Sequence, residues 1–268
     1  MVLPTRTVEK VWGRDELPAP FVSPEGKRIG EIWFEPPADL PELLVKYLFT
    51  SEKLSVQCHP DADQAEAAGL GRTGKEECWL VVAAEPGATL GIGFERELTA
   101  EEMRAAARDG SIEDLMVWHD VQPGDFFYIP ANTVHAIGPG CSIIEVQQTS
   151  DITYRLYDYG RDRELHLERG VAVAEGSPYP AELRKSLPAS GHANLVSGPA
   201  FTLDYVDGVA DDALLYAYSE KLLVVPLSGE VLVTGEVVKP GECAYAPSLA
   251  SVTFAPHGKA LVTAPCVS

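Results

Sequence analysis

The chain has 268 residues, which is long for one compact domain and short for three, so we expect one large unit or two smaller ones. It carries 21 Lys and Arg against 40 Asp and Glu, a net charge of −19, which argues against binding to nucleic acid or to anionic membranes. No uncharged apolar run approaches the length of a bilayer span, and segment 1–15 has no apolar core of signal-peptide length, so we expect a soluble cytoplasmic protein.

The elements expected along the chain are mostly short strands. Apolar runs alternate with Pro and Gly turns, at 43–49, 78–84, 125–130 and 141–148. This pattern is typical of an all-β sandwich or barrel. Helices are expected only as small inserts, in DADQAEAAGLG (61–71) and in TAEEMRAAARDG (99–110). In the second insert Thr99 and Glu102 form a capping box and Gly110 is the expected stop.

The stretch LSVQCHPDAD, residues 54–63, has the geometry of a ligand pair. Alternate side chains of a strand project to the same side, so Gln57 and His59 point together while Cys58 points away. The alternative is that Gln57 and His59 form only the polar face of an edge strand.

Two later segments offer further inward polar groups. GKEECWLVV (74–82) opens a strand with Lys75 and Glu77 on one face, although its neighbour Glu76 remains an alternative. PGDFFYIPANTVHAI (123–137) predicts a strand, a turn and a second strand that brings His135 inward, like the second conserved hairpin of cupins, which are small double-sheet barrels. The candidate ligands are Gln57, His59, Glu77 and His135. Two imidazoles, a carboxylate and a carboxamide oxygen suit a borderline divalent ion such as zinc.

An internal repeat divides the chain. Segment 121–137 aligns with 238–254, so that the Pro-Gly turn recurs, whereas His135 falls on Val252. The first copy therefore looks functional and the second structural. We expect two cupin-like jelly-roll barrels, a catalytic domain at 1–175 with the metal site and the helical inserts, and a degenerate domain at 176–268 without metal ligands.

Four segments of the sequence together resemble type I mannose-6-phosphate isomerases in their shorter bacterial form. They are SVQCHPDAD, GKEECW, PGDFFYIPANTVHAIG and EVQQTSDITYRLYDYGR. The resemblance is strong over about the first two-thirds of the chain and weak after it. It implies one zinc ion per chain, held by Gln57, His59, Glu77 and His135, and it selects Glu77 over Glu76.

The resemblance also implies the catalytic groups. Arg155 matches a catalytic arginine in an SDxxxR setting, Glu145 an active-site acid, and Arg161 a basic position. Lys75, Arg155 and Arg161 would bind the phosphate of the sugar in a locally positive site. From residue types alone, Arg155 and Arg161 could instead form surface salt bridges with nearby aspartates.

The implied reaction is the interconversion of mannose-6-phosphate and fructose-6-phosphate through an enediol or enediolate. A zinc ion would stabilise charge on the sugar oxygens, and either Glu145 or Lys75 would take the proton from carbon. The sequence leaves this choice open.

Three other functions compete with this reading. They are an isomerase of another sugar phosphate, a metal- or sugar-binding cupin without turnover, and an iron-dependent cupin oxygenase. The only partner expected is a small sugar phosphate, and a monomer is the default, with a homodimer possible. The remaining histidines, the tryptophans and the five scattered cysteines are expected to be structural, with the thiols reduced.

Overall fold

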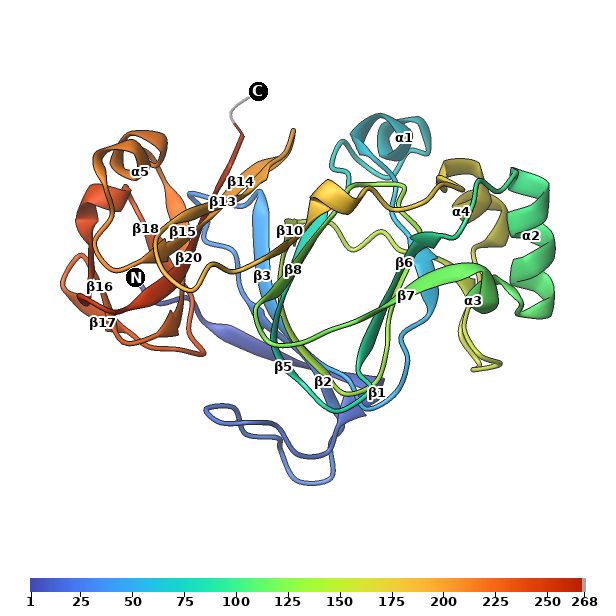
Figure 1. Cartoon of the computed structure of the whole chain (residues 1–268), viewed down its shortest axis with the longest axis horizontal. Coiled ribbons are helices and arrows are strands. Elements are labelled where there is room, and N and C mark those ends of the chain that lie inside the picture. The colour runs from blue at the N-terminus through green and yellow to red at the C-terminus, as the bar shows by residue number, and fades with distance from the viewer. Residues whose placement is uncertain (267–268) are drawn as a thin grey trace.

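The computed structural model describes residues 1–266, which form two β-sandwiches side by side (Figure 1). The first sandwich has a seven-stranded sheet with the order β1 (Thr5–Arg14), β2 (Ile29–Phe34), β3 (Leu43–Phe49), β10 (Cys141–Gln148), β5 (Glu77–Ala84), β8 (Asp125–Ile129) and β12 (Arg184–Ser186). Its five-stranded sheet has the order β11 (Tyr154–Tyr157), β4 (Val56–Cys58), β9 (His135–Ile137), β6 (Thr89–Phe94) and β7 (Met116–Asp120). The named strands pair antiparallel throughout both sheets, so the all-β prediction is confirmed.

The second sandwich is smaller. Its five-stranded sheet has the order β13 (Ala193–Ser197), β14 (Phe201–Asp207), β20 (Lys259–Pro265), β15 (Leu222–Ser228) and β18 (Ala244–Ala246), and its three-stranded sheet β17 (Glu236–Val238), β16 (Val231–Val233) and β19 (Val252–Phe254). The order β14-β20-β15-β18 repeats the order β3-β10-β5-β8 of the first sandwich, as the internal repeat predicts. His135 begins β9 and Val252 begins β19, at matching places in the two hairpins.

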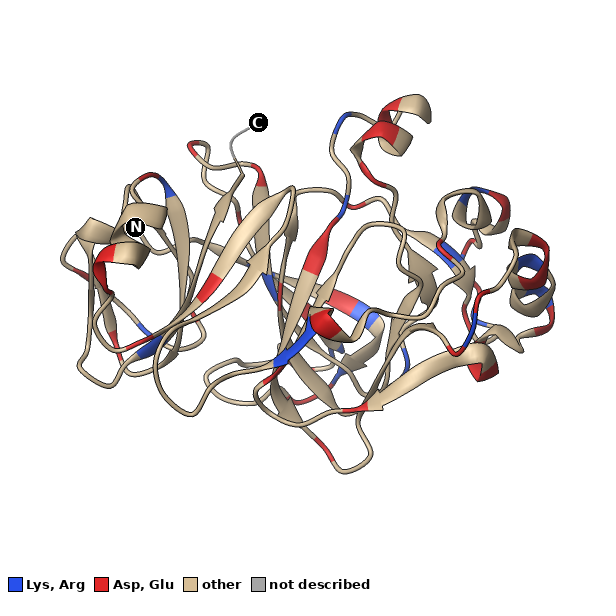
Figure 2. Cartoon of the chain, turned by 45° about the horizontal axis from the view of Figure 1, so that its top comes forward, with Lys and Arg blue, Asp and Glu red and all other residues tan. Residues whose placement is uncertain are grey.

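Helices are short and lie outside the sandwiches. They are α1 (Ala62–Ala67), α2 (Ala100–Asp109), α3 (Ile112–Leu115), α4 (Leu167–Val173) and α5 (Asp212–Ala217), with 3₁₀ turns at Ala181–Leu183 and Leu249–Ser251. The predicted capping box of α2 is present, and Gly110 ends the helix at φ 87°. Acidic and basic residues are mixed along the helices at one end of the molecule, where Arg104 of α2 pairs with Glu168 of α4 at 3.0 Å (Figure 2). No helix in the described part of the chain is long and apolar enough to cross a membrane.

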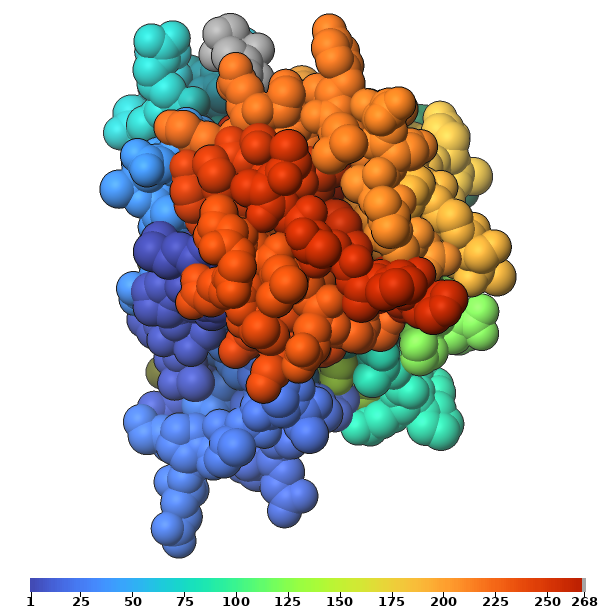
Figure 3. Space-filling model, turned by 90° about the vertical axis from the view of Figure 1, so that its left-hand side faces the viewer, coloured from blue at the N-terminus to red at the C-terminus, as the bar shows by residue number. Residues whose placement is uncertain are grey.

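A shared apolar core joins the two sandwiches. The outer face of the seven-stranded sheet, with Tyr47, Phe49 and Phe126, packs in one cluster with Phe201 and Tyr205 of the second sandwich. The second sandwich occupies the centre of this side of the molecule, with N-terminal residues beside and below it (Figure 3). The inner face of the seven-stranded sheet instead turns toward the five-stranded sheet of the first sandwich and lines a cavity there.

The chain passes between the sandwiches at its N-terminal segment and again after strand β12. The N-terminal residues join the second sandwich, where Leu3 N–H donates to Cys243 O at 2.8 Å (Figure 1). Strand β12 pairs with β8, so the first sandwich continues to Ser186, beyond the expected boundary at 175. We therefore propose the connection between Ser186 and Ala193 as the division between the two domains.

Candidate metal centre and active site

Three strands bring a buried triad together between the sheets. Gln57 of β4 lies opposite His135 of β9 in the five-stranded sheet, and His59 follows directly after β4. Glu77 begins β5 in the facing sheet. His59 Nε2 lies 3.6 Å from Glu77 Oε2, and His135 Nε2 lies 3.3 Å from Glu77 Oε1. The donor atoms of His59, Glu77 and His135 all lie within 4.8 Å of one another, so the triad could hold a metal ion.

The hydrogen bonds of the two imidazoles fit a metal. His59 Nδ1 lies 2.8 Å from Ile152 O, and His135 Nδ1 lies 2.9 Å from Thr133 O. A carbonyl only accepts, so each Nδ1 carries the proton and each neutral ring turns an Nε2 lone pair toward Glu77. Two nitrogen lone pairs and a carboxylate that converge in a buried place form a donor set that could hold a metal ion.

Burial keeps the imidazoles in the form that binds metal. Burial, together with the nearby Lys75 ammonium, lowers the pKa of His59 to about 4. Burial likewise lowers the pKa of His135. For Glu77 burial alone would raise the pKa, but the adjacent Lys75 ammonium outweighs it and the pKa lies well below its usual range. At neutral pH the triad is therefore two neutral imidazoles and a carboxylate.

Lys75 is the polar neighbour that touches the triad most closely. Its Nζ donates to Glu77 Oε2 and lies 3.0 Å from His59 Nε2. The side chain is buried, and it also lines the adjoining cavity. Lys75 thus places a positive charge at the edge of the triad, where a bound molecule would approach.

Gln57 is next to the triad and has room to join it. Its Nε2 lies 3.3 Å from His135 Nε2, and its Oε1 accepts from Ser55 Oγ at 3.0 Å. Because a hydroxyl can accept as well as donate, a 180° rotation of the amide would turn Oε1 toward the triad and keep the bond to Ser55. A fourth ligand is therefore available in the place the sequence predicts.

A cavity of about 500 Å³ opens beside the triad and is lined by Gln57, Lys75, Glu77, Glu145 and Arg155 among others. In its wall Glu145 Oε1 accepts from Lys46 Nζ at 2.9 Å and Glu145 Oε2 accepts from Trp79 Nε1 at 3.0 Å. Both Lys46 and Glu145 are almost fully buried. A cavity lined by charged side chains beside this triad is the arrangement of a site for a small polar molecule.

Comparisons with known proteins agree with this geometry. No family model matches the chain. The chain is 40% identical over 202 residues to the mannose-6-phosphate isomerase of Streptococcus mutans, an alignment covering 72% of this chain and 62% of that protein. It is 42% identical over 139 residues to mannose-6-phosphate isomerase ManA of Bacillus subtilis, covering 50% of this chain and 44% of that protein. The crystal structure of the mannose 6-phosphate isomerase from Bacillus subtilis superposes with a TM-score of 0.81 at 25% identity, over 98% of both chains.

In sequence and in fold the chain is similar to mannose-6-phosphate isomerases. The sequence alignments nevertheless span less than two thirds of the curated relatives that they match. The family fold and the buried triad occur together here, as the resemblance implied.

The two arginines expected from the family resemblance have different surroundings. Arg155 of β11 lies opposite Gln57 in the ladder, lines the cavity, and has no carboxylate within salt-bridge distance among residues 1–266. Arg161 is not among the residues that line the cavity; it pairs with Asp158 at 3.3 Å and with Glu52 at 3.0 Å. Arg161 thus forms ion pairs, as in the alternative that the sequence left open, although its partner Asp158 is buried. Arg163, which the sequence analysis did not consider, lines the cavity instead and pairs with Asp158.

Sequence reasoning also missed residues that hold the ligand segments in place. Asn132 lies in the turn before His135 at φ 75°, and its N–H donates to His59 O at 2.7 Å. Gln64 of α1 donates to Asn132 Oδ1 at 2.6 Å and completes the capping box with Asp61. Asn tolerates this left-handed conformation better than most residues. The sequence Pro-Ala-Asn at 130–132 could therefore have indicated this turn. The network ties the segments of both histidines together.

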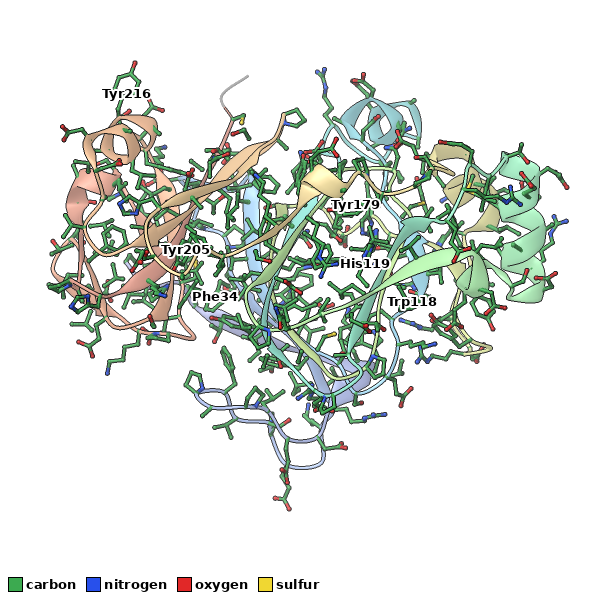
Figure 4. The ribbon with its side chains drawn as sticks, viewed as in Figure 1. Phe34, Trp118, His119, Tyr179, Tyr205 and Tyr216 are labelled. Carbon is green, nitrogen blue, oxygen red and sulfur yellow. The ribbon has the colours of Figure 1, made fainter. Side chains whose placement is uncertain are left out.

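Most residues expected to be structural are so. Trp12 and Trp79 are buried, and His119 packs against Tyr179 and Phe127 rather than joining the triad (Figure 4). All five cysteines are free, and Cys266 alone among them is exposed. Trp33 differs from the expectation of a core residue, because it is only half-buried, and all three of these tryptophans line the cavity.

Proposed function

We propose that this protein is a zinc-dependent isomerase that interconverts mannose-6-phosphate and fructose-6-phosphate. The observation that carries the proposal is the buried triad of His59, Glu77 and His135 beside a cavity whose wall holds Lys75 and Arg155. The curated relatives bear the name of this activity, which supports the same substrates here. A single chain is the expected functional unit.

The proposed zinc ligands are Gln57, His59, Glu77 and His135. Nitrogen donors and a carboxylate in a closed, buried triad suit zinc better than the harder ions calcium or magnesium, which prefer oxygen alone. When bound, the ion would stabilise the negative charge that develops on the oxygens of the sugar as it passes through the enediolate. The second sandwich keeps no histidine at the matching position and would serve as support.

The proton transfer between C2 and C1 needs a group that can accept a proton. Glu145 Oε1 accepts a hydrogen bond from Lys46 Nζ at 2.9 Å, and a carboxylate is a group that can accept a proton. Lys75 Nζ, in contrast, donates a hydrogen bond to Glu77 Oε2 and is engaged as a donor. Between the two candidates, we therefore propose Glu145 as the base and Lys75 as the group that faces the developing charge.

Arg155 would orient the substrate from the opposite wall. It adjoins Gln57 across the β4–β11 ladder, so its guanidinium is available to sugar oxygens at the reacting end as well as to the phosphate. The ion pairs of Arg161 make it a residue that holds the segment after β11, and its predicted contact with phosphate would require those pairs to open.

A coupled assay tests the proposal. We expect fructose-6-phosphate to form from mannose-6-phosphate with the zinc-loaded protein, to stop after chelation, and to return when zinc is restored. Turnover that is indifferent to chelation would contradict the metal site. Zinc retained without turnover of mannose-6-phosphate would contradict the substrate and direct the search to other sugar phosphates or to a binding role.

The affinity for zinc should change little with mild acidification. Protons compete for the imidazole lone pairs, and two imidazoles with the ordinary pKa near 6.5 would lose affinity by about a hundredfold between pH 7 and pH 5.5. Burial lowers the pKa of His59 to about 4 and that of His135 in the same direction. We therefore expect less than about a tenfold loss over that range, measured by calorimetric competition with a chelator, and loss of binding as the pH falls through about 4. A hundredfold loss by pH 5.5 would show that the rings titrate as free histidine does.

A further inference from the structure

The cavity has two ends, and the family resemblance supplies cations for only one of them. Lys75 contacts Glu77, and Arg155 adjoins Gln57, so both lie at the triad. Arg161 forms ion pairs with Glu52 and Asp158, and it is not among the residues that line the cavity. A hexose 6-phosphate that presents C1 and C2 to the triad carries its phosphate at the other end of the six-carbon chain. A cation is therefore needed farther along the cavity wall, and this inference rests on the proposed function.

One row of side chains crosses the inner face of the seven-stranded sheet toward that end. Arg6, Trp33, Lys46 and Glu145 are direct neighbours on the consecutive strands β1, β2, β3 and β10. Adjacent strands lie about 4.8 Å apart, so the row leads over roughly 14 Å from Glu145 to Arg6 at the edge strand. All four residues line the same cavity. The row thus runs from the proposed proton-transfer group to the cavity rim.

Trp33 is the residue that holds Arg6 over the cavity. The Arg6 guanidinium carbon lies 4.5 Å from the centre of the Trp33 ring, and Lys46 Nζ lies 4.7 Å from the same centre. Trp33 is fixed in turn, because its Nε1 donates to Glu31 Oε2 at 2.6 Å. Stacking on an indole face is favourable for a guanidinium and leaves its N–H groups free to bind an anion.

Arg6 differs from most other cations of the wall in lacking a carboxylate partner. Within residues 1–266, Lys10 pairs with Glu31, Lys46 with Glu145, Lys75 with Glu77 and Arg163 with Asp158. Arg6 forms no salt bridge in the same part of the chain, and it is exposed. In a protein of net charge −19, an uncompensated cation on a cavity rim is where an anion would be attracted.

We propose that Arg6, stacked on Trp33, is the anchor for the substrate phosphate. Its planar guanidinium can hold two phosphate oxygens at once, which fixes the far end of the sugar while C1 and C2 lie at the triad. Arg6 is therefore a specificity residue that distinguishes the phosphorylated sugar from the free sugar, and it takes no part in the proton transfer.

The test separates binding of phosphate from chemistry. In the zinc-loaded protein, Arg6→Gln should raise KM for mannose-6-phosphate about tenfold and leave kcat nearly unchanged, as expected for loss of a charge-assisted bond at an exposed site. Arg6→Lys should recover only part of the affinity, because a lysine keeps the charge and loses the fork and the stacking. Arg108→Gln, the same change on α2, should behave like the unaltered protein.

Calorimetry with inorganic phosphate gives a readout that does not depend on turnover. Arg6→Gln should weaken binding of phosphate about tenfold, and Arg108→Gln should not. Unchanged KM and unchanged phosphate affinity in Arg6→Gln would overturn the assignment, as would a fall in kcat with constant KM. If the unaltered protein fails to isomerise mannose-6-phosphate, the proposed function fails, whereas loss of phosphate affinity in Arg6→Gln would still support the anion site.

Discussion

Replacing Glu77 by glutamine should abolish retention of zinc and lower turnover of mannose-6-phosphate by about a thousandfold. Glu77 is the only carboxylate of the triad, and its two oxygens face the Nε2 atoms of both histidines. Without its charge the site loses the ligand that balances a divalent ion, and the Lewis-acid contribution of several kcal/mol to the barrier is lost with the ion. Metal content after dialysis and the coupled assay measure the two effects.

Glu76→Gln is the matched control for this substitution. Glu76 is the adjacent residue in sequence, but it contacts the Tyr128 hydroxyl on the other side of the strand and lies outside the triad. We expect this variant to keep its zinc and its activity. The assignment fails if Glu77→Gln retains zinc while Glu76→Gln loses it. Because Lys75 loses its ion-pair partner in Glu77→Gln, a thermal melt should establish that this variant is folded before its metal content is measured.

Lys46→Met should destabilise the protein by about 3–5 kcal/mol. The Lys46 ammonium is 6% exposed and contacts Glu145, which is 4% exposed, as well as Gln147 Oε1. Glu145 and the nearby Glu31 outweigh the effect of burial and raise the pKa of Lys46. Removing the cation leaves the Glu145 carboxylate buried without its charge partner, and the loss of one member of a buried pair is far costlier than the loss of both. Urea unfolding followed by circular dichroism measures the change.

Two further variants make the stability prediction specific. Lys27→Met removes a cation from an exposed pair with Glu9 and should cost less than about 1 kcal/mol. Lys46→Met combined with Glu145→Gln should recover much of the loss, because no unpaired carboxylate then remains. If the double variant is as unstable as the sum of its parts, the two side chains do not act as a pair.

The class of fold and the ligand segments can be predicted from the sequence, because both depend on local rules. Alternation along a strand predicted that Gln57 and Glu77 point inward, and the family resemblance selected Glu77 over Glu76. Capping residues set both ends of α2, and the repeated Pro-Gly turn placed His135 and Val252 at matching positions. Each of these features is decided within about a dozen neighbouring residues, so a motif in the sequence is enough to predict it.

Which charged side chains pair with one another depends on the tertiary structure. Lys46 and Glu145 are separated by 99 residues and become neighbours only through the register of β3 and β10. The same register aligns Arg6 and Trp33 with them, and no local pattern in the sequence specifies it. Arg161 and Arg163 lie two residues apart in an irregular segment, where side-chain direction follows from partners such as Glu52 rather than from periodicity. Long-range pairing across sheets is set by the packing of the whole sandwich. This pairing brings charged residues that are far apart in the sequence to the wall of one cavity.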